Sequence, residues 1–227
     1  MYLSRVPLNP ARAGTRKFLS SPHVTHGAVM KSFPPGTLDN ALGDGRLLWR
    51  IDKNSNDVHL YVVSPAAPDF THIIEQAGWP TTGAWETRKY GQLLDKLTPG
   101  QLWHFRLTAN PVRNVKNRSD PETARARGKV TALEADQELD WLHRKTISAG
   151  FGLTKAGPAT QREDDVRIIS RENRTFMRSG RKVTLSTATF EGVLEVTDAD
   201  LLRTTLIQGI GRAKGYGCGL LTLAPNQ

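Results

Sequence analysis

Two histidines and a lysine lie close together near the start of the chain, in the stretch SSPHVTHGAVMKSF (residues 20–33). His23 and His26 are three residues apart, and Lys31 follows five residues after His26. Imidazoles exchange protons near neutral pH, and the first amides of a helix favour phosphate. This stretch could therefore perform acid–base chemistry on a phosphate ester, although its residue types also suit a metal site or a packed helix face.

A metal site is the weakest of these three interpretations. A zinc ion would need a third and usually a fourth ligand beside His23 and His26. The chain has one cysteine, Cys218, and its other histidines are scattered without the spacing of ligands. We therefore expect no metal in this stretch and no cofactor.

The packed-face and acid–base interpretations are harder to separate. Four residues share one sector of an ideal helix, as they would on a packed face: His23, His26, Met30 and Phe33. Lys31 projects about 140° around such a helix from His26, so the two side chains meet only across a substrate or on an irregular helix. Spacing alone leaves both interpretations open.

The elements around this stretch follow the order strand, helix, strand, strand, helix, strand. A helix should begin at Ser21 and Pro22, because serine caps free amides and proline is tolerated at the first helical position. Apolar patterns and turn residues predict the remaining elements, which are strands at residues 1–8, 46–52, 58–64 and 85–89 and a second helix at 68–78.

The second half of the chain repeats the same order. Strands are predicted at residues 101–112, 166–170, 183–197 and 217–225, and helices at 133–151 and 198–210. The first of these helices should be amphipathic, with an apolar face of Leu133, Leu139, Leu142 and Ile147. The predicted fold class is therefore α+β, with two tandem ferredoxin-like βαββαβ domains at residues 1–96 and 101–227.

The formal net charge of +9 is concentrated in two segments of the second half. Residues 112–130 have almost no bulky apolar side chains and read as a mobile loop with six basic residues: Arg113, Lys116, Arg118, Arg125, Arg127 and Lys129. Residues 167–187 read as a β-hairpin that turns at Ser179-Gly180, with Arg171, Arg174, Arg178, Arg181 and Lys182. Charged runs usually mean a solvated surface, but clustered guanidinium groups suit nucleic-acid phosphates and predict nucleic-acid binding.

The C-terminal stretch GIGRAKGYGCGLL is the densest glycine cluster, with Gly209, Gly211, Gly215, Gly217 and Gly219. It follows a predicted helix and precedes a strand, which is the reverse of the dinucleotide-binding order, and it lacks the Walker triplet. Such a loop either caps a helix and turns, or lets backbone approach a ligand closely, with Arg212 and Lys214 beside it.

Five segments together resemble one family along essentially the whole chain. They are the MYLSRV start, the histidine at position 26, LWHFRLTANPVR, FEGVLEVTDADLL and the closing GIGRAKGYGCGLLTLAP. These segments are similar to the CasE family of the RAMP superfamily, the CRISPR RNA-processing endoribonucleases of the type I-E Cascade complex.

The resemblance implies metal-independent cutting of the repeat stem-loops of precursor CRISPR RNA, followed by retention of the 3′ hairpin within Cascade. It assigns general acid/base chemistry to His26 and places Lys31 by the scissile phosphate. The family commonly has a tyrosine three residues before this histidine, where this chain has His23. It also implies that the hairpin at 171–182 and the 112–130 loop contact the RNA stem, and that the glycine-rich loop lies beside the cut.

The compartment and partners follow from the same features. The N-terminus has no apolar segment of a secretory signal, and no run is long enough to span a membrane. We therefore expect a cytoplasmic protein that is monomeric when free and that binds repeat RNA and other Cascade subunits. A non-catalytic RNA-binding subunit and a metal-dependent phosphodiesterase are the alternatives.

Overall fold

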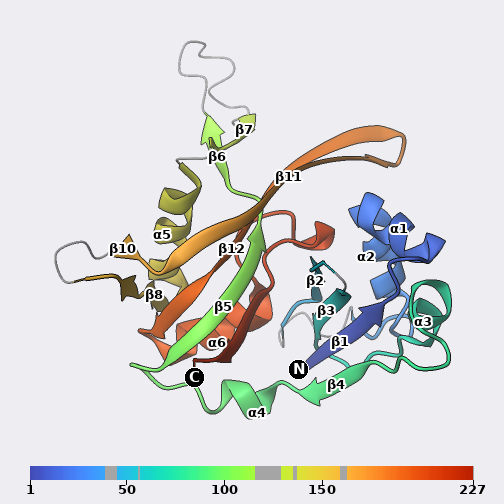
Figure 1. Ribbon diagram of the computed structural model, residues 1–227, viewed down its shortest axis with the longest axis horizontal. Coiled ribbons are helices and arrows are strands. Elements are labelled where there is room, and N and C mark those ends of the chain that lie inside the picture. Colours follow the sequence, from blue (N-terminus) through green and yellow to red (C-terminus); the bar gives the residue numbers. More distant parts are fainter. Residues whose placement is uncertain (39–44, 56, 116–128, 135–136, 159–162, 227) are drawn as a thin grey trace.

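The strands form two larger antiparallel sheets, one from each half of the chain (Figure 1). The computed structural model describes residues 1–38, 45–55, 57–115, 129–134, 137–158 and 163–226. Helices connect the strands of both sheets, and the predicted α+β class with two ferredoxin-like units is confirmed. No helix in these ranges is long and apolar enough to cross a membrane.

The first sheet has the strand order β2-β3-β1-β4. Its strands are β1 (Tyr2–Leu8), β2 (Leu48–Lys53), β3 (Val58–Ser64) and β4 (Glu86–Lys89). Helices α1 (Ala13–Ser20) and α2 (Pro22–Met30) lead from β1 to β2, and α3 (Thr71–Ala77) leads from β3 towards β4. This order and these connections are those of a βαββαβ unit, in which the first and third strands lie at the centre.

The second sheet has the order β11-β12-β5-β13, and the short strand β8 also pairs with β12. Its strands are β5 (Leu102–Ala109), β8 (Phe151–Leu153), β11 (Val166–Arg178), β12 (Arg181–Val196) and β13 (Leu221–Pro225). The connecting helices are α5 (Gln137–Ala149) and α6 (Ala199–Gln208), and the 3-10 helix η3 (Lys214–Tyr216) lies between α6 and β13. The smaller elements are α4 (Gly91–Leu94) and the paired strands β6 (Val112–Val115) with β7 (Lys129–Ala132) and β9 (Lys155–Ala156) with β10 (Glu163–Asp164).

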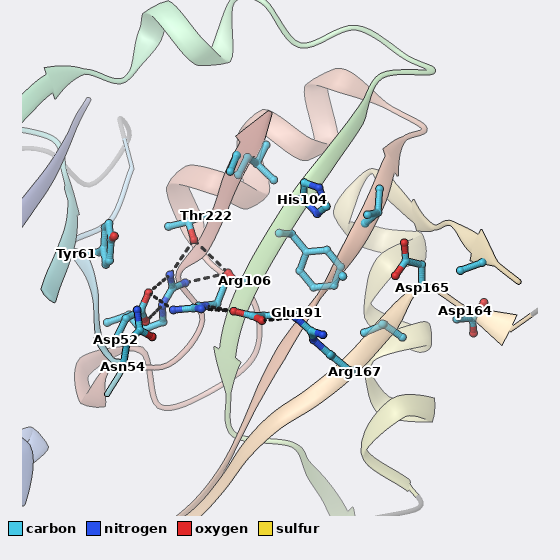
Figure 2. Close-up of a pocket in the computed structure, with 18 of the residues that line it drawn as sticks. Asp52, Asn54, Tyr61, His104, Arg106, Asp164, Asp165, Arg167, Glu191 and Thr222 are labelled. Atoms are coloured by element: carbon cyan, nitrogen blue, oxygen red, sulfur yellow. Dashed lines mark hydrogen bonds and ion pairs between the residues drawn. The ribbon is translucent and has the colours of Figure 1, made fainter. Parts of the chain in front are cut away.

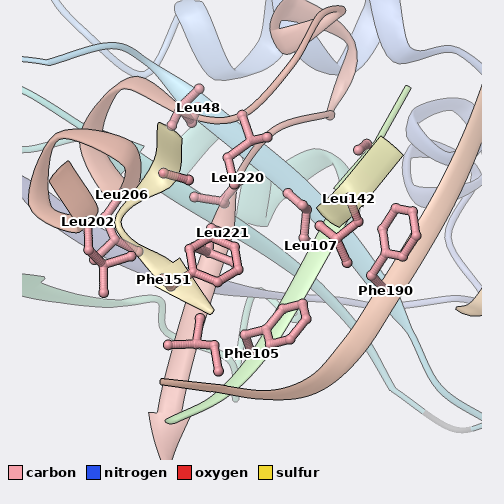
Figure 3. Packing of buried hydrophobic residues seen from close by; sticks show 14 of the residues in the cluster. Leu48, Phe105, Leu107, Leu142, Phe151, Phe190, Leu202, Leu206, Leu220 and Leu221 are labelled. Atoms are coloured by element: carbon pink, nitrogen blue, oxygen red, sulfur yellow. The ribbon is translucent and has the colours of Figure 1, made fainter. Parts of the chain in front are cut away.

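Strand β2 joins the two halves of the molecule. Its residue Trp49 belongs to the apolar core of the first sheet and its helices, whereas Leu48 belongs to the core of the second (Figure 3). Arg50 is 2% exposed, and its guanidinium donates to the backbone oxygens of Arg106 and Leu220. A buried cation must be paired and hydrogen-bonded, so these bonds fix β2 against β5 and β13.

Several predicted boundaries in the second half are wrong. Residues 101–112 do not form one strand, because β5 ends at Ala109 just before Pro111, which has no N–H to donate to a ladder. The helix predicted at 133–151 extends only from Gln137 to Ala149. Ile147 is 82% exposed and lies off the apolar face to which it was assigned.

Two other segments differ from prediction. Helix α1 was not predicted. Its N-cap residue, Arg12, provides no side-chain hydrogen bond, and the helix is only eight residues long. Residues 112–130 were expected to be a loop throughout, but both ends pair as β6 and β7 with Val112 opposite Ala132. Residues 116–128 lie outside the described ranges.

Candidate active site and nucleic-acid interface

Helix α2, which contains His23 and His26, begins at Ser21 and Pro22 as the sequence predicted. Ser21 caps α2 by accepting a hydrogen bond from the Val24 amide at 3.4 Å, and Pro22 occupies the first helical turn. The buried face of α2 consists of Pro22, Thr25 and Val29. His23 is exposed and His26 is half-buried at the edge of this face. The interpretation of the two histidines as a packed helix face is therefore wrong for His23 and incomplete for His26.

The imidazole of His26 lies between strand β2 and the glycine-rich loop. The indole Nε1–H of Trp49 donates to His26 Nδ1 at 3.4 Å. Gly215 lies over the face of the ring, because a Cβ built on it would lie 3.7 Å from Nε2, 3.8 Å from Cε1 and 3.9 Å from Cδ2. Two elements from different halves of the chain thus lie against the ring, and Nδ1 is the nitrogen that strand β2 occupies.

The glycine-rich loop approaches this site because one of its residues can only be glycine. Gly217 has φ +81°, and a Cβ there would come within 2.8 Å of Trp49 Cζ3. A positive φ and so short a contact both exclude larger residues without rearrangement. Gly217 therefore lets the loop backbone pack directly on Trp49, in addition to the turn that the glycines make.

Positive charges from several elements surround His26. Burial is the main cause that lowers its pKa below the usual value of 6.5, and the charges of His23, Arg46 and Arg178 act in the same direction. The pKa of Lys214 is also lowered, by burial first and then by Arg46 and Lys145. We call Arg46, Lys145, Arg178, Arg212 and Lys214, together with His23 and His26, the His26 face.

Sequence reasoning missed Arg46, Lys145 and Trp49 as members of this region. Arg46 is a single cation before a strand, Lys145 follows Arg144 on a helix that the sequence predicts to be amphipathic, and Trp49 has the pattern of an ordinary core residue of a strand. A cavity of about 240 Å³ beside the face is lined by Lys145, Arg212 and Trp141, among others. Only the pairing of the two sheets brings these residues to one place.

The arginine-rich hairpin has the predicted form and extends away from the second sheet towards α1 and α2 (Figure 1). Ser179 and Gly180 form its two-residue turn with φ of 47° and 76°, as a primed hairpin turn requires. Within the described residues, Arg178, Arg181 and Lys182 at its tip form no ion pair. Arg171 and Arg174 do form ion pairs, with Glu138 and Glu172 respectively, each at 2.7 Å.

The other predicted contact residues are less well placed by the structure. Arg113 is exposed on β6 and Arg212 is exposed in the glycine-rich loop. Lys31 is exposed at the C-terminal end of α2 and forms no hydrogen bond with His26 within the described chain. Lys116, Arg118, Arg125 and Arg127 lie outside the described residues, and Lys129 starts β7.

No three histidine, cysteine, aspartate or glutamate side chains gather as a possible metal site in the part of the chain that is described. A larger cavity of about 1120 Å³ lies between the two sheets, away from His26 (Figure 2). We call it the inter-sheet cleft. Asp52 lies 3.0 Å from Arg106, and Glu191 pairs with both Arg106 and Arg167. Its charged groups therefore largely neutralise one another.

Comparison with known proteins gives consistent results. The family model described as "CRISPR associated protein" matches residues 1–225. The "CRISPR-associated endoribonuclease Cse3" of Thermus thermophilus is 30% identical over 232 residues, covering 99% of this chain and 100% of that protein. The "CRISPR system Cascade subunit CasE" of Escherichia coli is 33% identical over 187 residues, covering 78% of this chain and 88% of that one. A solved structure of Cse3 bound to 19 nt RNA has a TM-score of 0.76 at 28% identity, covering 99% of this chain and 100% of that chain.

Proposed function

Because the chain belongs to the CRISPR-associated protein family, we propose that it is a metal-independent endoribonuclease that cuts precursor CRISPR RNA at repeat stem-loops. One relative is named an endoribonuclease and has a solved structure with RNA, and another is named a Cascade subunit. The observation that carries the proposal for this chain is the half-buried imidazole of His26 on a face of unneutralised cations. The protein then keeps the 3′ hairpin and joins Cascade.

The reaction uses a nucleophile that the RNA itself supplies. The 2′-hydroxyl next to the scissile phosphate attacks phosphorus, the bond to the 5′-oxygen breaks, and the products are a 2′,3′-cyclic phosphate and a 5′-hydroxyl. The hydroxyl must lose a proton, the leaving oxygen must gain one, and the crowded phosphate needs positive charge around it. Imidazoles and water can exchange these protons, and cations can supply the positive charge.

The His26 face offers these groups in one place. His26 is the residue assigned to proton exchange or hydrogen bonding at the phosphate, and His23 is the second imidazole within reach of the same region. Arg46, Arg178 and Lys214 supply positive charge from three other elements. Lys31 is assigned a phosphate contact only across a bound substrate, since it does not touch His26 directly.

The RNA stem would lie along the arginine-rich hairpin. Arg178, Arg181 and Lys182 are exposed at its tip, and β11 also contacts α2, so a stem held by the hairpin would end close to His26. Guanidinium groups without an acidic partner are free to bind phosphate oxygens in pairs. Tight binding of the stem would also explain retention of the product and slow turnover.

A non-catalytic RNA-binding subunit is the second candidate function. The observation that favours it is His23, which occupies the position where the family commonly has a tyrosine, and which is exposed rather than held against His26 by a hydrogen bond within the described residues. This candidate has the same RNA-binding surface and predicts tight stem-loop binding with no product, even when the protein is in excess.

Substitution of two histidines separates the candidates. Single-turnover cleavage of a repeat stem-loop should fall about 100- to 10,000-fold in His26→Ala, because acid–base groups contribute on that scale. The matched control is His104→Ala, since His104 lines the inter-sheet cleft and should leave cleavage unchanged. Stem-loop affinity should stay within a few-fold in both. Unchanged cleavage by His26→Ala would remove His26 from the reaction, and absence of cleavage by the wild-type protein would favour the second candidate.

A further inference from the structure

The hydrogen bond between Trp49 and His26 determines which nitrogen of the imidazole carries hydrogen. An indole N–H can only donate, so the partner nitrogen must offer a lone pair. The Trp49 Nε1–H is directed at His26 Nδ1. A neutral imidazole has one N–H and one lone pair, so its hydrogen must then be on Nε2.

Trp49 is well suited to impose this choice because it cannot easily turn away. Its side chain is 1% exposed, and it belongs to the core of the first sheet. A Cβ on Gly217 would approach the Trp49 ring to 2.8 Å, so the backbone of the glycine-rich loop lies directly against the indole. Turning the ring would leave a buried N–H without an acceptor, which is costly.

Nε2 is the ring nitrogen left for a ligand, because the Trp49 indole occupies Nδ1. Gly215 lies over the face of the ring and has no side chain to cover it. His26 is half-buried, whereas Trp49 is fully enclosed, so the imidazole keeps some contact with solvent and the indole does not.

We propose that Trp49 is a positioning residue for the proposed cleavage, because it fixes neutral His26 with its hydrogen on Nε2, so that the ring offers the RNA an N–H donor and not a lone pair. Neutral His26 is then unable to take the 2′-hydroxyl proton at Nε2. It donates a hydrogen bond to an oxygen of the scissile phosphate or to the leaving 5′-oxygen, while His23 or water takes the 2′-hydroxyl proton and water protonates the leaving oxygen. This inference rests on the proposed function for its chemical meaning, but the tautomer is a property of the protein alone.

The charged groups that face the ring act in the same direction as Trp49. They are His23 on α2 itself, Arg46 before β2 and Arg178 on β11, and Lys214 on η3 lies beside Arg46. His23, Arg46 and Arg178 each disfavour a second proton on the ring. The cations shift the equilibrium between imidazolium and neutral ring, whereas only the indole N–H distinguishes the two neutral tautomers.

The experiment is nitrogen NMR of the histidine rings in RNA-free protein at a pH where His26 is neutral. The His26 signals are assigned by comparison with His26→Gln. The wild-type protein should show His26 with hydrogen on Nε2 and a bare Nδ1. A neutral His26 that carries its hydrogen on Nδ1 would overturn the proposal, and this result needs no RNA to be cleaved.

Trp49→Phe tests the cause and keeps most of the ring volume. Without the donor, the fraction of His26 with hydrogen on Nε2 should fall and its pKa should rise by about 0.5 to 1 unit. The pH at which cleavage is half-maximal should move upward with it. Trp103→Phe is the matched control, because the indole of Trp103 on β5 donates to Gln101 and not to His26, and it should change neither property. An unshifted His26 titration in folded Trp49→Phe would also overturn the proposal.

The two failures can be told apart. If the tautomer is as stated but the protein cuts no RNA, the proposed endoribonuclease function fails and the hydrogen bond remains. If the protein cuts RNA but His26 is the other tautomer, the function remains and Trp49 has no positioning role.

Discussion

The inter-sheet cleft and the His26 face differ in how their charges are balanced. The cleft is the larger space, at about 1120 Å³, and its arginines are paired with Asp52 and Glu191 (Figure 2). The cations of the His26 face form no ion pair within the described residues. A polyanion binds more favourably at the His26 face, because it replaces counterions there and breaks no internal salt bridge. The balance of charges therefore favours the His26 face as the RNA-binding surface, although the cleft is larger.

The largest expected difference between the regions is in stability, and it concerns two arginines. Arg50→Met should lower the free energy of unfolding by about 3–5 kcal/mol, since it leaves the Asp52 carboxylate and two carbonyls without their buried partner. Arg178→Met, at the exposed hairpin tip, should leave stability nearly unchanged. Denaturant unfolding of both variants measures the contrast.

RNA binding should show the reverse ranking of the same two variants. Arg178→Met should weaken stem-loop affinity and reduce the dependence of affinity on salt concentration by about one phosphate contact. Arg50→Met, where it folds, should keep the wild-type salt dependence. Equal effects of the two variants on both properties would contradict this contrast, in which the cleft stabilises the fold and the His26 face binds RNA.

Two glycines with similar backbone angles sharpen the description of the His26 face. Gly217 has φ +81° and Gly180 has φ +76°, but only a Cβ on Gly217 would meet another side chain. Gly217→Ala should cost about 2–4 kcal/mol, from the left-handed backbone and the clash with Trp49. Gly180→Ala should cost about 1–2 kcal/mol, from the backbone alone. Equal losses in thermal unfolding would contradict the close packing of the loop on Trp49.

The smallest expected effect is the acid sensitivity of the cleft. Burial raises the pKa of Asp52, but hydrogen bonds and charge from Arg50 and Arg106 outweigh it and bring the pKa below its usual 3.8. The stability from this carboxylate is therefore present above that value and is lost as pH falls below it.

Asp52→Asn tests this pH dependence. The variant should be about 1–3 kcal/mol less stable than wild type at pH 7, because both arginines lose a charged acceptor. The difference should shrink as the pH falls below about 3.8. If the difference in the free energy of unfolding stays constant from pH 7 to pH 3, the charge of Asp52 contributes nothing to stability in the cleft.

Features of this molecule that depend on neighbouring residues could be predicted from sequence. Helix α2 was placed correctly because Ser21 and Pro22 form a local start signal. The hairpin was placed correctly because Ser179-Gly180 separates two strand-like runs. The ferredoxin-like order followed from the repeated pattern of elements.

Features that depend on pairing of distant segments could not be predicted from sequence. Trp49 is 23 residues from His26, and the acceptors of Arg50 include the Leu220 carbonyl, 170 residues away. Nothing near these residues in sequence indicates such contacts. Arg46 and Lys145 are likewise far from His26 in the sequence and join the His26 face only through the arrangement of the two sheets. His26 was therefore proposed from the family resemblance of the sequence, whereas the charges around it and the hydrogen bond that orients it came from the structure.

Incubation of the purified protein with repeat stem-loop RNA in excess chelator tests the central claim most directly. Single-turnover cleavage should proceed and give a 2′,3′-cyclic phosphate and a 5′-hydroxyl, and a single 2′-deoxy substitution before the cut should abolish it. Continued cutting of the deoxy RNA, or loss of cutting in chelator that added metal restores, would contradict cleavage by 2′-hydroxyl attack at the His26 face.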